Sequence, residues 1–191
     1  TAGAASDVFA HLEFCTQVLR PELDVQFFSV TDQWAQFSIA GPRSRELVSG
    51  LCDEDISNER IPYMACAEVT IGGIGCRLFR ISFSGEQSYE IAIPARYGEA
   101  LARELGQRAA ALGGGWYGLE ALNALRIEKG YLTHAEMTGQ YTADALGIGG
   151  MVSAKKDCIG KVLSQRSALV GPGKMELIGL KPVSPLKQFS G

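Results

Sequence analysis

Alternating apolar and polar positions in the middle of the chain predict a set of short β-strands. The segments with this pattern are 34–40, 63–71, 74–83 and 89–93. Successive side chains of a strand point to opposite faces, so one face of each segment is apolar. The pair Gly72-Gly73 separates the second segment from the third, which predicts a hairpin. The runs 23–30 and 175–180 are also predicted to be strands, the second one without a partner downstream.

Apolar residues at helical spacing predict helices between these strands. The predicted helices lie at 6–20, 42–51, 97–112 and 117–129. In the last of them Leu119, Leu122 and Leu125 share one side and are predicted to face the core. Gly130 follows, at the position where a glycine often ends a helix.

The order of these elements indicates the fold class. From Trp34 onward it is strand, helix, two hairpin strands, another strand and a helix. Because strands and helices do not alternate strictly, a doubly wound parallel sheet is disfavoured. We therefore expect an α+β fold of the split βαβ (ferredoxin-like) type, with helices on one face of a mainly antiparallel sheet.

Composition narrows the class of protein. The chain has 191 residues, of which 46% are hydrophobic and 20% charged, and a net charge of −3. This is enough for one buried core, or for one domain and a small piece of another. The negative charge disfavours sequence-independent binding to nucleic acid, and no apolar run is long enough to cross a membrane. No secretory signal is visible, and the first residue, Thr1, indicates a processed product or a fragment.

Cysteine usage predicts a cytoplasmic protein. The five cysteines are odd in number, irregularly spaced and free of CxxC pairs, and the chain has two histidines. A zinc site is therefore disfavoured, and no metal site is expected. We expect reduced and mostly buried thiols.

The glycine-rich pieces predict turns rather than phosphate loops. Residues 72–75 lie in the predicted hairpin, and residues 113–115 follow a predicted helix. A dinucleotide fingerprint requires a strand before the glycines and a helix after them. Neither piece meets this condition, and the sequence contains no GxSxG motif of a serine hydrolase.

Glu90 is the first candidate for a binding role. It shares a strand face with Ser88 and Ala92, opposite the face that carries Tyr89 and Ile91. One interpretation is a solvated outer face. The other is a carboxylate fixed on a rigid strand, which could accept two parallel hydrogen bonds from the N–C–NH₂ edge of a pterin or purine.

Arg126 is the second candidate, because it borders the apolar stripe of its helix. It could be a snorkelling arginine or form an ion pair, with Glu128 or Glu90 as the partner. Alternatively, its forked guanidinium could bind an anionic ligand. Arg80 leaves the same two alternatives open.

Two ordered stretches carry a family resemblance. Residues 83–91 read FSGEQSYEI, and residues 125–131 read LRIEKGY. They resemble the folate-dependent aminomethyltransferases of the glycine-cleavage T-protein group, which carry an aromatic-x-G-E-x-x-Y-E-I stretch before a helix ending in L-R-x-E-x-G. A closer resemblance, over nearly the whole chain, is to the C-terminal region of the α subunits of heterotetrameric sarcosine oxidases. The phrases that carry it include PELDV at 21–25, SVTDQWA at 29–35 and IPYM at 61–64.

The resemblance implies part of an oxidoreductase that demethylates sarcosine to glycine together with other sarcosine oxidase subunits. The T-protein-like region would bind tetrahydrofolate and capture the one-carbon unit as 5,10-methylenetetrahydrofolate. FAD, FMN and NAD would belong to the parent complex, largely on other segments and subunits. Alternatives are a stand-alone aminomethyltransferase, a dimethylglycine-oxidising relative, or a non-catalytic folate-binding or subunit-contact module.

The same resemblance implies roles for particular residues. Glu90 would bind the pteridine ring, and Phe83, where the family commonly has Tyr, would stack on it. Arg126 would hold the glutamyl carboxylate of the folate, while Tyr89 and Gly85 would shape the pocket. The catalytic aspartate of the family would lie upstream of the matched stretch, so no catalytic residue is assigned.

The resemblance also implies a domain organisation. Residues 1–166 would form the folate-binding domain without its N-terminal part, and residues 167–191 a linker and the first strand of a truncated C-terminal β-barrel. After residue 131 the family usually reads G-Q-E, where this chain has Thr133-His134-Ala135-Glu136. Uncovered apolar surface and sheet edges would favour self-association.

Overall fold

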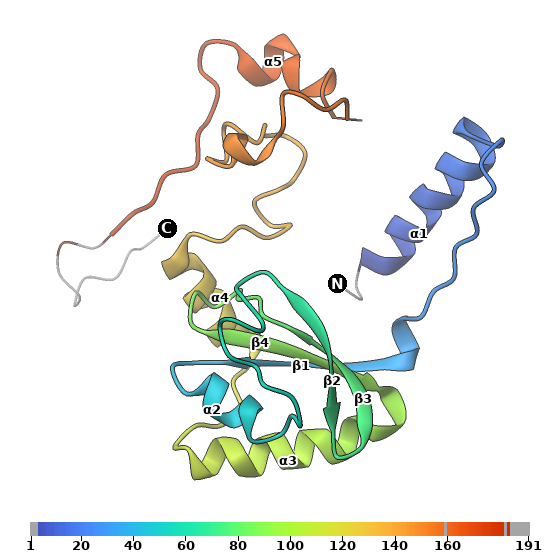
Figure 1. Ribbon diagram of the computed structural model, residues 1–191. Helices are drawn as coiled ribbons and strands as arrows, with labels where there is room; N and C mark the ends of the chain where they lie inside the picture. The colour runs from blue at the N-terminus through green and yellow to red at the C-terminus, as the bar shows by residue number, and fades with distance from the viewer. Residues whose placement is uncertain (1–3, 159, 182, 184–191) are drawn as a thin grey trace. The chain divides into compact units, whose positions relative to one another are not determined.

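The computed structural model describes residues 4–158, 160–181 and 183. The chain divides into two compact units, residues 1–123 and 124–191. The first unit holds the sheet and its helices, and the second begins within the helix α4 (Leu119–Lys129). Figure 1 gives the labels of the elements.

The first unit is built on a four-stranded sheet of order β1-β4-β3-β2, in which every neighbouring pair is antiparallel. The strands are β1 (Trp34–Ala40), β2 (Cys66–Ile71), β3 (Ile74–Phe79) and β4 (Ser88–Pro94). All four predicted segments are confirmed as strands, and the two hairpin strands are shorter than predicted. The α+β class is confirmed as well.

The four predicted helices form in the predicted order along the chain, and a short fifth helix follows them. They are α1 (Ala5–Phe14) with a π-helical turn at Cys15–Leu19, α2 (Ser44–Ser49), α3 (Gly98–Ala111), α4 and the single-turn α5 (Ser167–Val170). Short 3₁₀ turns lie at Thr31–Gln33, Ala95–Tyr97, Gly149–Met151 and Leu163–Gln165.

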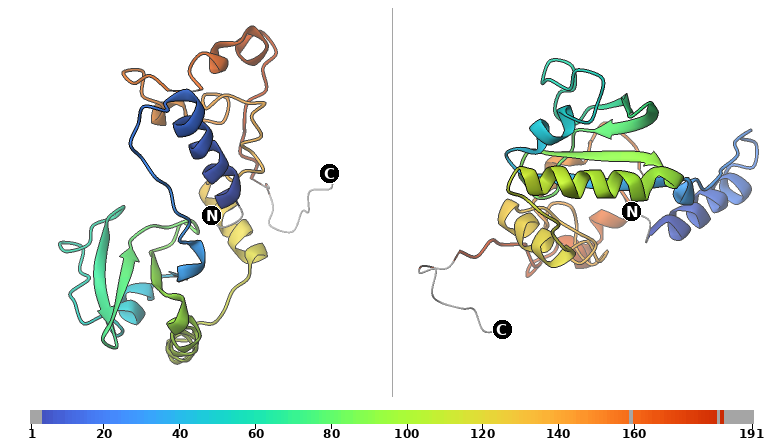
Figure 2. Two further views of the ribbon diagram at one scale, coloured as in Figure 1. Left: turned by 90° about the vertical axis from the view of Figure 1, so that its right-hand side faces the viewer. Right: turned by 90° about the horizontal axis from the view of Figure 1, so that it is seen from below.

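The core of the first unit lies between one face of the sheet and helices α2 and α3. Figure 2 shows α3 running along the sheet. Leu101 and Leu105 of α3 and Leu47 and Val48 of α2 are buried in one cluster with the strand residues. The α3 helix approaches β1 closely, since a Cβ on Gly98 would come within 2.7 Å of the Ala35 Cβ. The inner strand β4 has β1 and β3 beside it, and α2 contacts it on one face.

The hairpin turn depends on its two glycines. Gly72 and Gly73 have φ angles of +56° and +78°, a left-handed conformation that costs a residue with a Cβ about 1–2 kcal/mol. Consecutive left-handed residues fit the twist of a tight hairpin. The predicted β2–β3 hairpin is confirmed.

Other predicted elements are wrong. Residues 23–30 form no strand and are mostly exposed, because no other strand among the described residues pairs with them. Residues 175–180 are also irregular, with one backbone hydrogen bond from Leu177 N to Ala145 O (2.8 Å). Residues 182 and 184–191 of the predicted 167–191 segment lie outside the described residues.

The predicted core stripe of α4 is only partly buried, with Leu122 and Leu125 half-buried, and no residue of α1 is buried. Leu119 of α4 is 84% exposed, and Arg126 is the buried residue of this helix. An apolar stripe is buried only where a second element covers it.

The cysteines are free, as expected, but they are not mostly buried. Cys76 is buried, Cys15 and Cys52 are half-buried, and Cys66 and Cys158 are exposed. Cys66 is exposed because it points away from the core at the start of the edge strand β2.

Candidate functional site

Glu90 lies in the middle of β4, between strands β1 and β3. It faces Ser38 of β1 and Phe79 of β3 in the register of the sheet. Tyr89 and Ile91, its neighbours along the strand, point into the core and are fully buried. The carboxylate of Glu90 is half-buried on the other face of the sheet, as the alternation predicts.

Gln36 of β1 holds the carboxylate of Glu90. The amide Nε2 of Gln36 donates a hydrogen bond to Glu90 Oε2. Both side chains project from neighbouring strands of a sheet, so the orientation of the carboxylate is fixed by backbone pairing rather than by a loop. The sequence analysis did not identify Gln36, because its position opposite β4 depends on the pairing of two distant strands.

The same face of the sheet carries a hollow of about 620 Å³ beside Gln36. Its sheet side is formed by Trp34, Gln36, Arg77, Phe79 and Ala92. The guanidinium carbon of Arg77 lies 4.4 Å from the centre of a Trp34 ring, a cation–π contact. An aromatic ring, a cation and an amide thus occupy the same face of the sheet as Glu90.

Phe83 and Gly85 lie in the loop between β3 and β4. Gly85 has a φ of +85°, and its backbone N–H donates to Ser82 Oγ (3.1 Å). Phe83 is 37% exposed. This loop leads directly into the strand that carries Glu90. Phe83, Gly85 and Glu90 therefore all belong to the first compact unit.

Tyr89 has a different environment from the other candidates. Its side chain is fully buried in the core, and its hydroxyl accepts a hydrogen bond from Arg45 Nε (2.8 Å). The structure therefore places the side chains of Tyr89 and Glu90 on opposite faces of β4. An influence of Tyr89 on a pocket at Glu90 would act through the position of the strand.

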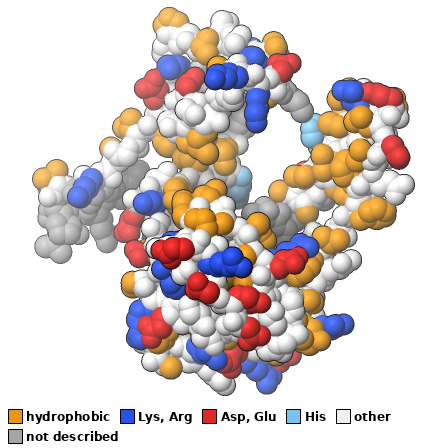
Figure 3. Space-filling view, viewed as in Figure 1, with side chains coloured by type: hydrophobic (Ala, Val, Ile, Leu, Met, Phe, Trp, Pro, Cys, Tyr) orange, Lys and Arg blue, Asp and Glu red, His pale blue; other side chains and the backbone are white. Residues whose placement is uncertain are grey.

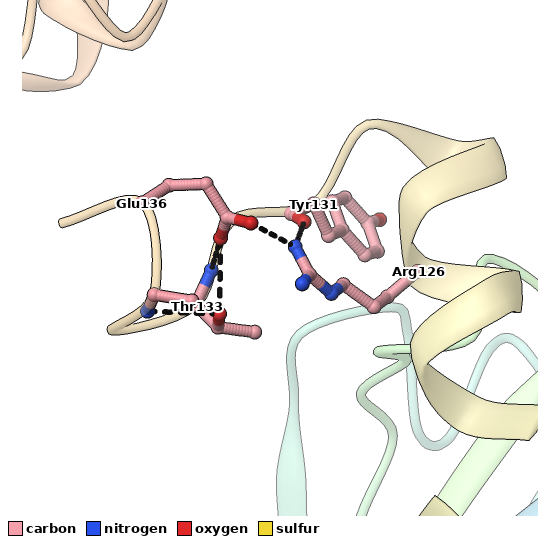
Figure 4. A network of polar contacts seen from close by, with 5 residues as sticks. Arg126, Tyr131, Thr133 and Glu136 are labelled. Carbon is pink, nitrogen blue, oxygen red and sulfur yellow. Dashed lines mark hydrogen bonds and ion pairs between the residues drawn. The ribbon is translucent and has the colours of Figure 1, made fainter. Parts of the chain in front are cut away.

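Arg126 lies in the last turns of α4 and belongs to the second unit. Its side chain is 6% exposed, and its Nη1 donates to Glu136 Oε1 (2.8 Å) and to the carbonyl of Tyr131 (3.1 Å). The sequence suggested Glu128 or Glu90 as the ion-pair partner, and the partner is Glu136. Figure 4 shows the guanidinium pointing toward the carboxylate of Glu136.

Glu136 is itself fixed by the turn that carries it. Its Oε2 accepts hydrogen bonds from the backbone N–H (2.7 Å) and the hydroxyl (2.9 Å) of Thr133. These bonds, together with that from Arg126, lower the pKa of Glu136 to about 2, so the carboxylate is ionised at neutral pH. The Thr-x-x-Glu spacing of a capping box is the signal in the sequence that could have identified this contact.

Arg80, the other arginine singled out in the sequence, anchors a loop. Its Nη1 donates to the backbone carbonyl of Ile61 (2.9 Å), and Ile61 is buried. This contact supports the structural interpretation of Arg80.

The position of the glycine-rich stretch does not support a dinucleotide-binding loop. The glycine-rich stretch at 113–118 lies between the helices α3 and α4, where a Rossmann fingerprint requires a strand first. The residues described contain no group of three or more His, Cys, Asp or Glu side chains that could hold a metal ion. In the part of the chain that the structure covers, every helix is too short or too polar to span a bilayer.

Comparison with known proteins identifies relatives over nearly the whole chain. The family model described as the GCVT N-terminal domain matches residues 1–156. The sarcosine oxidase subunit alpha of Rhizobium meliloti is 49% identical over 99% of this chain and 20% of its own length. The corresponding subunit of Corynebacterium sp. (strain U-96) is 38% identical over 96% of this chain and 19% of its own length.

An aminomethyltransferase is a more distant relative. The protein of Caldanaerobacter subterraneus is 29% identical over 83% of this chain and 42% of its own length. The chain thus spans about a fifth of the length of the two sarcosine oxidase subunits that it resembles.

Proposed function

Because this chain belongs to the GCVT N-terminal domain family, we propose that it is the folate-binding part of a sarcosine oxidase α subunit. The identity of 49% over 99% of the chain supports this assignment, and an aminomethyltransferase at 29% identity supports the folate-dependent chemistry. The intact enzyme would oxidise sarcosine with O₂ to glycine and hydrogen peroxide. Tetrahydrofolate would receive the released carbon as 5,10-methylenetetrahydrofolate.

The observation that carries the proposal is the fixed carboxylate of Glu90. A carboxylate held on a paired strand accepts hydrogen bonds from an N–C–NH₂ edge without first losing side-chain freedom. The pteridine ring of folate presents such an edge. In this proposal Glu90 binds that edge, Phe83 stacks on the ring, and Gly85 and Tyr89 set the course of the backbone around it.

Arg126 is the proposed partner of the glutamyl carboxylate of the folate. A guanidinium matches a carboxylate in charge and in fork geometry. Each charged contact of this kind contributes about 1.5–3 kcal/mol where it is desolvated and paired.

The finer features of the fold are part of the same proposal. β1 and β3 each pair antiparallel with β4, so they run in the same direction with β4 between them, as in a split βαβ unit. We propose that residues 1–166 belong to the folate-binding domain and that residues 167–191 lead into a β-barrel. FAD, FMN and NAD would belong to the parent complex, largely on other segments and subunits, as the resemblance implies.

Calorimetric titration of tetrahydrofolate into the intact protein tests the site. We expect Glu90→Gln, which removes the charge and keeps the shape, to weaken binding by roughly 10- to 100-fold, the loss of one charged hydrogen bond. Glu68→Gln is the matched control, because Glu68 lies on the same sheet face, opposite Arg77 in the β2–β3 register. Equal affinities of both variants and the unsubstituted protein would contradict the proposed site.

The products of sarcosine oxidation test the reaction. If folate captures the one-carbon unit at this site, Glu90→Gln should release more free formaldehyde and less 5,10-methylenetetrahydrofolate. The rate of hydrogen peroxide formation should stay unchanged, because the substitution leaves the oxidation step intact. An enzyme of the aminomethyltransferase type, the alternative that the relative from Caldanaerobacter favours, would produce no hydrogen peroxide.

A further inference from the structure

The contacts of Arg126 show a guanidinium that already has a carboxylate partner. Nη1 carries two N–H groups, and the structure gives it two acceptors, Glu136 Oε1 at 2.8 Å and the Tyr131 carbonyl at 3.1 Å. A ligand carboxylate that binds this nitrogen must therefore replace one of them. We call Arg126, Tyr131, Thr133 and Glu136 the Arg126 network (Figure 4).

Glu136 is the replaceable acceptor of the network. The Tyr131 carbonyl is part of the backbone that leaves α4, and its residue also donates its N–H to Arg126 O (2.8 Å). The Glu136 side chain, by contrast, is 24% exposed while that of Arg126 is 6% exposed, so the carboxylate is the more accessible member of the pair. Rotation of one side chain can expose Nη1 without unwinding the helix.

Thr133 holds the carboxylate of Glu136 in the orientation that reaches Arg126, so a rotation away from Arg126 also weakens the bonds to Thr133. Glu136 Oε2 bonds to Thr133 alone, whereas Oε1 bonds to Arg126. Two ionised carboxylates at one nitrogen repel each other, so the incoming group and Glu136 compete for Arg126.

We propose that Glu136 occupies the position of the ligand carboxylate on Arg126 and that the anionic tail of the ligand binds by exchange with it. Glu136 thereby sets the affinity for the tail, as an internal competitor, and the Thr133 contacts determine how firmly it competes. The identity of the tail as the glutamyl group of folate rests on the proposed function. The exchange itself rests on the contacts of the Arg126 network.

The direction of the effect of one substitution tests the exchange. Glu136→Gln removes the competing charge but keeps the shape, and an amide oxygen attracts a guanidinium less strongly than a carboxylate does because it has no net charge. We expect this variant to bind N-(4-aminobenzoyl)-L-glutamate, the tail fragment of folate, roughly tenfold more tightly than the unsubstituted protein. If Glu136 instead positions Arg126 for the ligand, the affinity should fall.

Two controls accompany the measurement, which is made by calorimetry on the intact protein. Glu128→Gln removes an equal charge from the exposed side of α4, the helix that carries Arg126, and should leave the affinity unchanged. Arg126→Gln should abolish binding of the fragment, both alone and combined with Glu136→Gln.

A second variant covers the case in which Glu136→Gln does not fold. Thr133→Ala removes the hydroxyl that bonds to Glu136 Oε2 and leaves both charges in place. It should raise the affinity for the fragment in the same direction by roughly tenfold, the effect of losing one hydrogen bond from a hydroxyl to the ionised carboxylate of the competitor.

Failure of the exchange can be distinguished from failure of the proposed function. Unchanged or weaker binding of the fragment by the folded Glu136 or Thr133 variant, or no binding by any variant, would overturn the exchange, whether or not folate binds. A fragment response as expected, with no binding of 5-formyltetrahydropteroate, which lacks the glutamate, would support the exchange and contradict the pteridine site.

Discussion

At the scale of single residues, Glu136 links the stability of the second unit to pH. Its pKa is lowered to about 2 from the ordinary 4.5 by the backbone N–H of Thr133, by Arg126 and by the Thr133 hydroxyl. A carboxyl group with a lowered pKa stabilises the folded state fully above its unfolded value and loses this effect as the pH falls through the folded value. The stabilisation should therefore be complete above pH 4.5 and be lost between pH 4.5 and 2.

Urea unfolding of the protein and of Glu136→Gln between pH 7 and 3 checks this expectation. The variant should be less stable at neutral pH, because it leaves a buried guanidinium without its charged partner. The difference in the free energy of unfolding between the unsubstituted protein and the variant should shrink as the pH falls below 4.5. A difference that stays constant across the range would show that the charge of Glu136 does not stabilise the fold.

The cysteines should differ sharply in reactivity. Burial, followed by the charges near it, raises the pKa of Cys52 to about 12, and burial also raises the pKa of Cys76. Cys66 and Cys158 are exposed. Because the thiolate is the reactive form, a chromogenic disulfide at pH 8 should label Cys66 and Cys158 in the folded protein, and Cys52 and Cys76 only after unfolding.

A double variant, Cys66→Ser with Cys158→Ser, identifies the reacting groups. The folded double variant should lose the fast phase of labelling. In denaturant its three remaining cysteines should all react. Rapid labelling of Cys52 in the folded double variant would contradict the buried environment of that thiol.

At this scale the sequence predicts the orientation of a side chain correctly where that orientation depends on neighbouring residues of the chain. Alternation along one strand places Glu90 and Tyr89 on opposite faces, and the structure has them there. The contact of Gln36 with Glu90 depends on the pairing of β1 with β4, which a local pattern does not encode. The pairing of Arg126 with Glu136 depends on the turn at Thr133, which brings a carboxylate beyond the helix back to the guanidinium.

At the scale of elements, the β2–β3 hairpin should depend on the conformation of its turn. Gly73 has a φ of +78° and open space around its Cβ position, so an alanine there meets strain but no clash. Gly73→Ala should destabilise the protein by about 1–2 kcal/mol. Gly75 of β3 also has open space and lacks a positive φ, so Gly75→Ala should be neutral or stabilising by up to about 1 kcal/mol.

Thermal unfolding of the two alanine variants measures the difference. Equal melting temperatures would show that the turn conformation carries no strain for an alanine. A loss of stability in Gly75→Ala alone would point instead to a contact of the strand face that the open space around Gly75 does not predict.

The predicted elements are correct where a partner is available and wrong where it is lacking. The pattern at 34–40 becomes β1 because β4 pairs with it along its whole length. The equally apolar run at 23–30 stays irregular because no described strand lies beside it. Periodicity therefore indicates which face an element can bury, and tertiary contacts decide whether the element forms.

At the scale of the whole molecule, the N-terminal segment exposes many apolar side chains. Figure 3 shows hydrophobic side chains gathered along α1 and the segment that follows it. Val8, Val18 and Phe28 are 56%, 62% and 79% exposed. Contiguous apolar surface of this kind is typical of interaction sites or of association between copies.

We therefore expect this chain to self-associate, as the sequence analysis suggested, and the segment to be responsible. Replacing Val8, Val18 and Phe28 together by serine should lower the average mass in light scattering at high protein concentration. Val162→Ser, which removes a 79% exposed side chain from the second unit, is the control and should leave the mass unchanged. A monomer at every concentration before substitution would contradict the expectation.

The order of strands in the sheet has a consequence for how the chain folds. β1 has β4 as its neighbour in the sheet, and in the register Trp34 lies opposite Pro94. The β2–β3 hairpin needs contacts only between residues close together in the chain, whereas β1 must wait for a large loop to close, at an entropic cost that grows with the length of that loop. During synthesis β1 therefore leaves the ribosome well before β4 exists, and the β1 edge of the sheet is the last part to assemble.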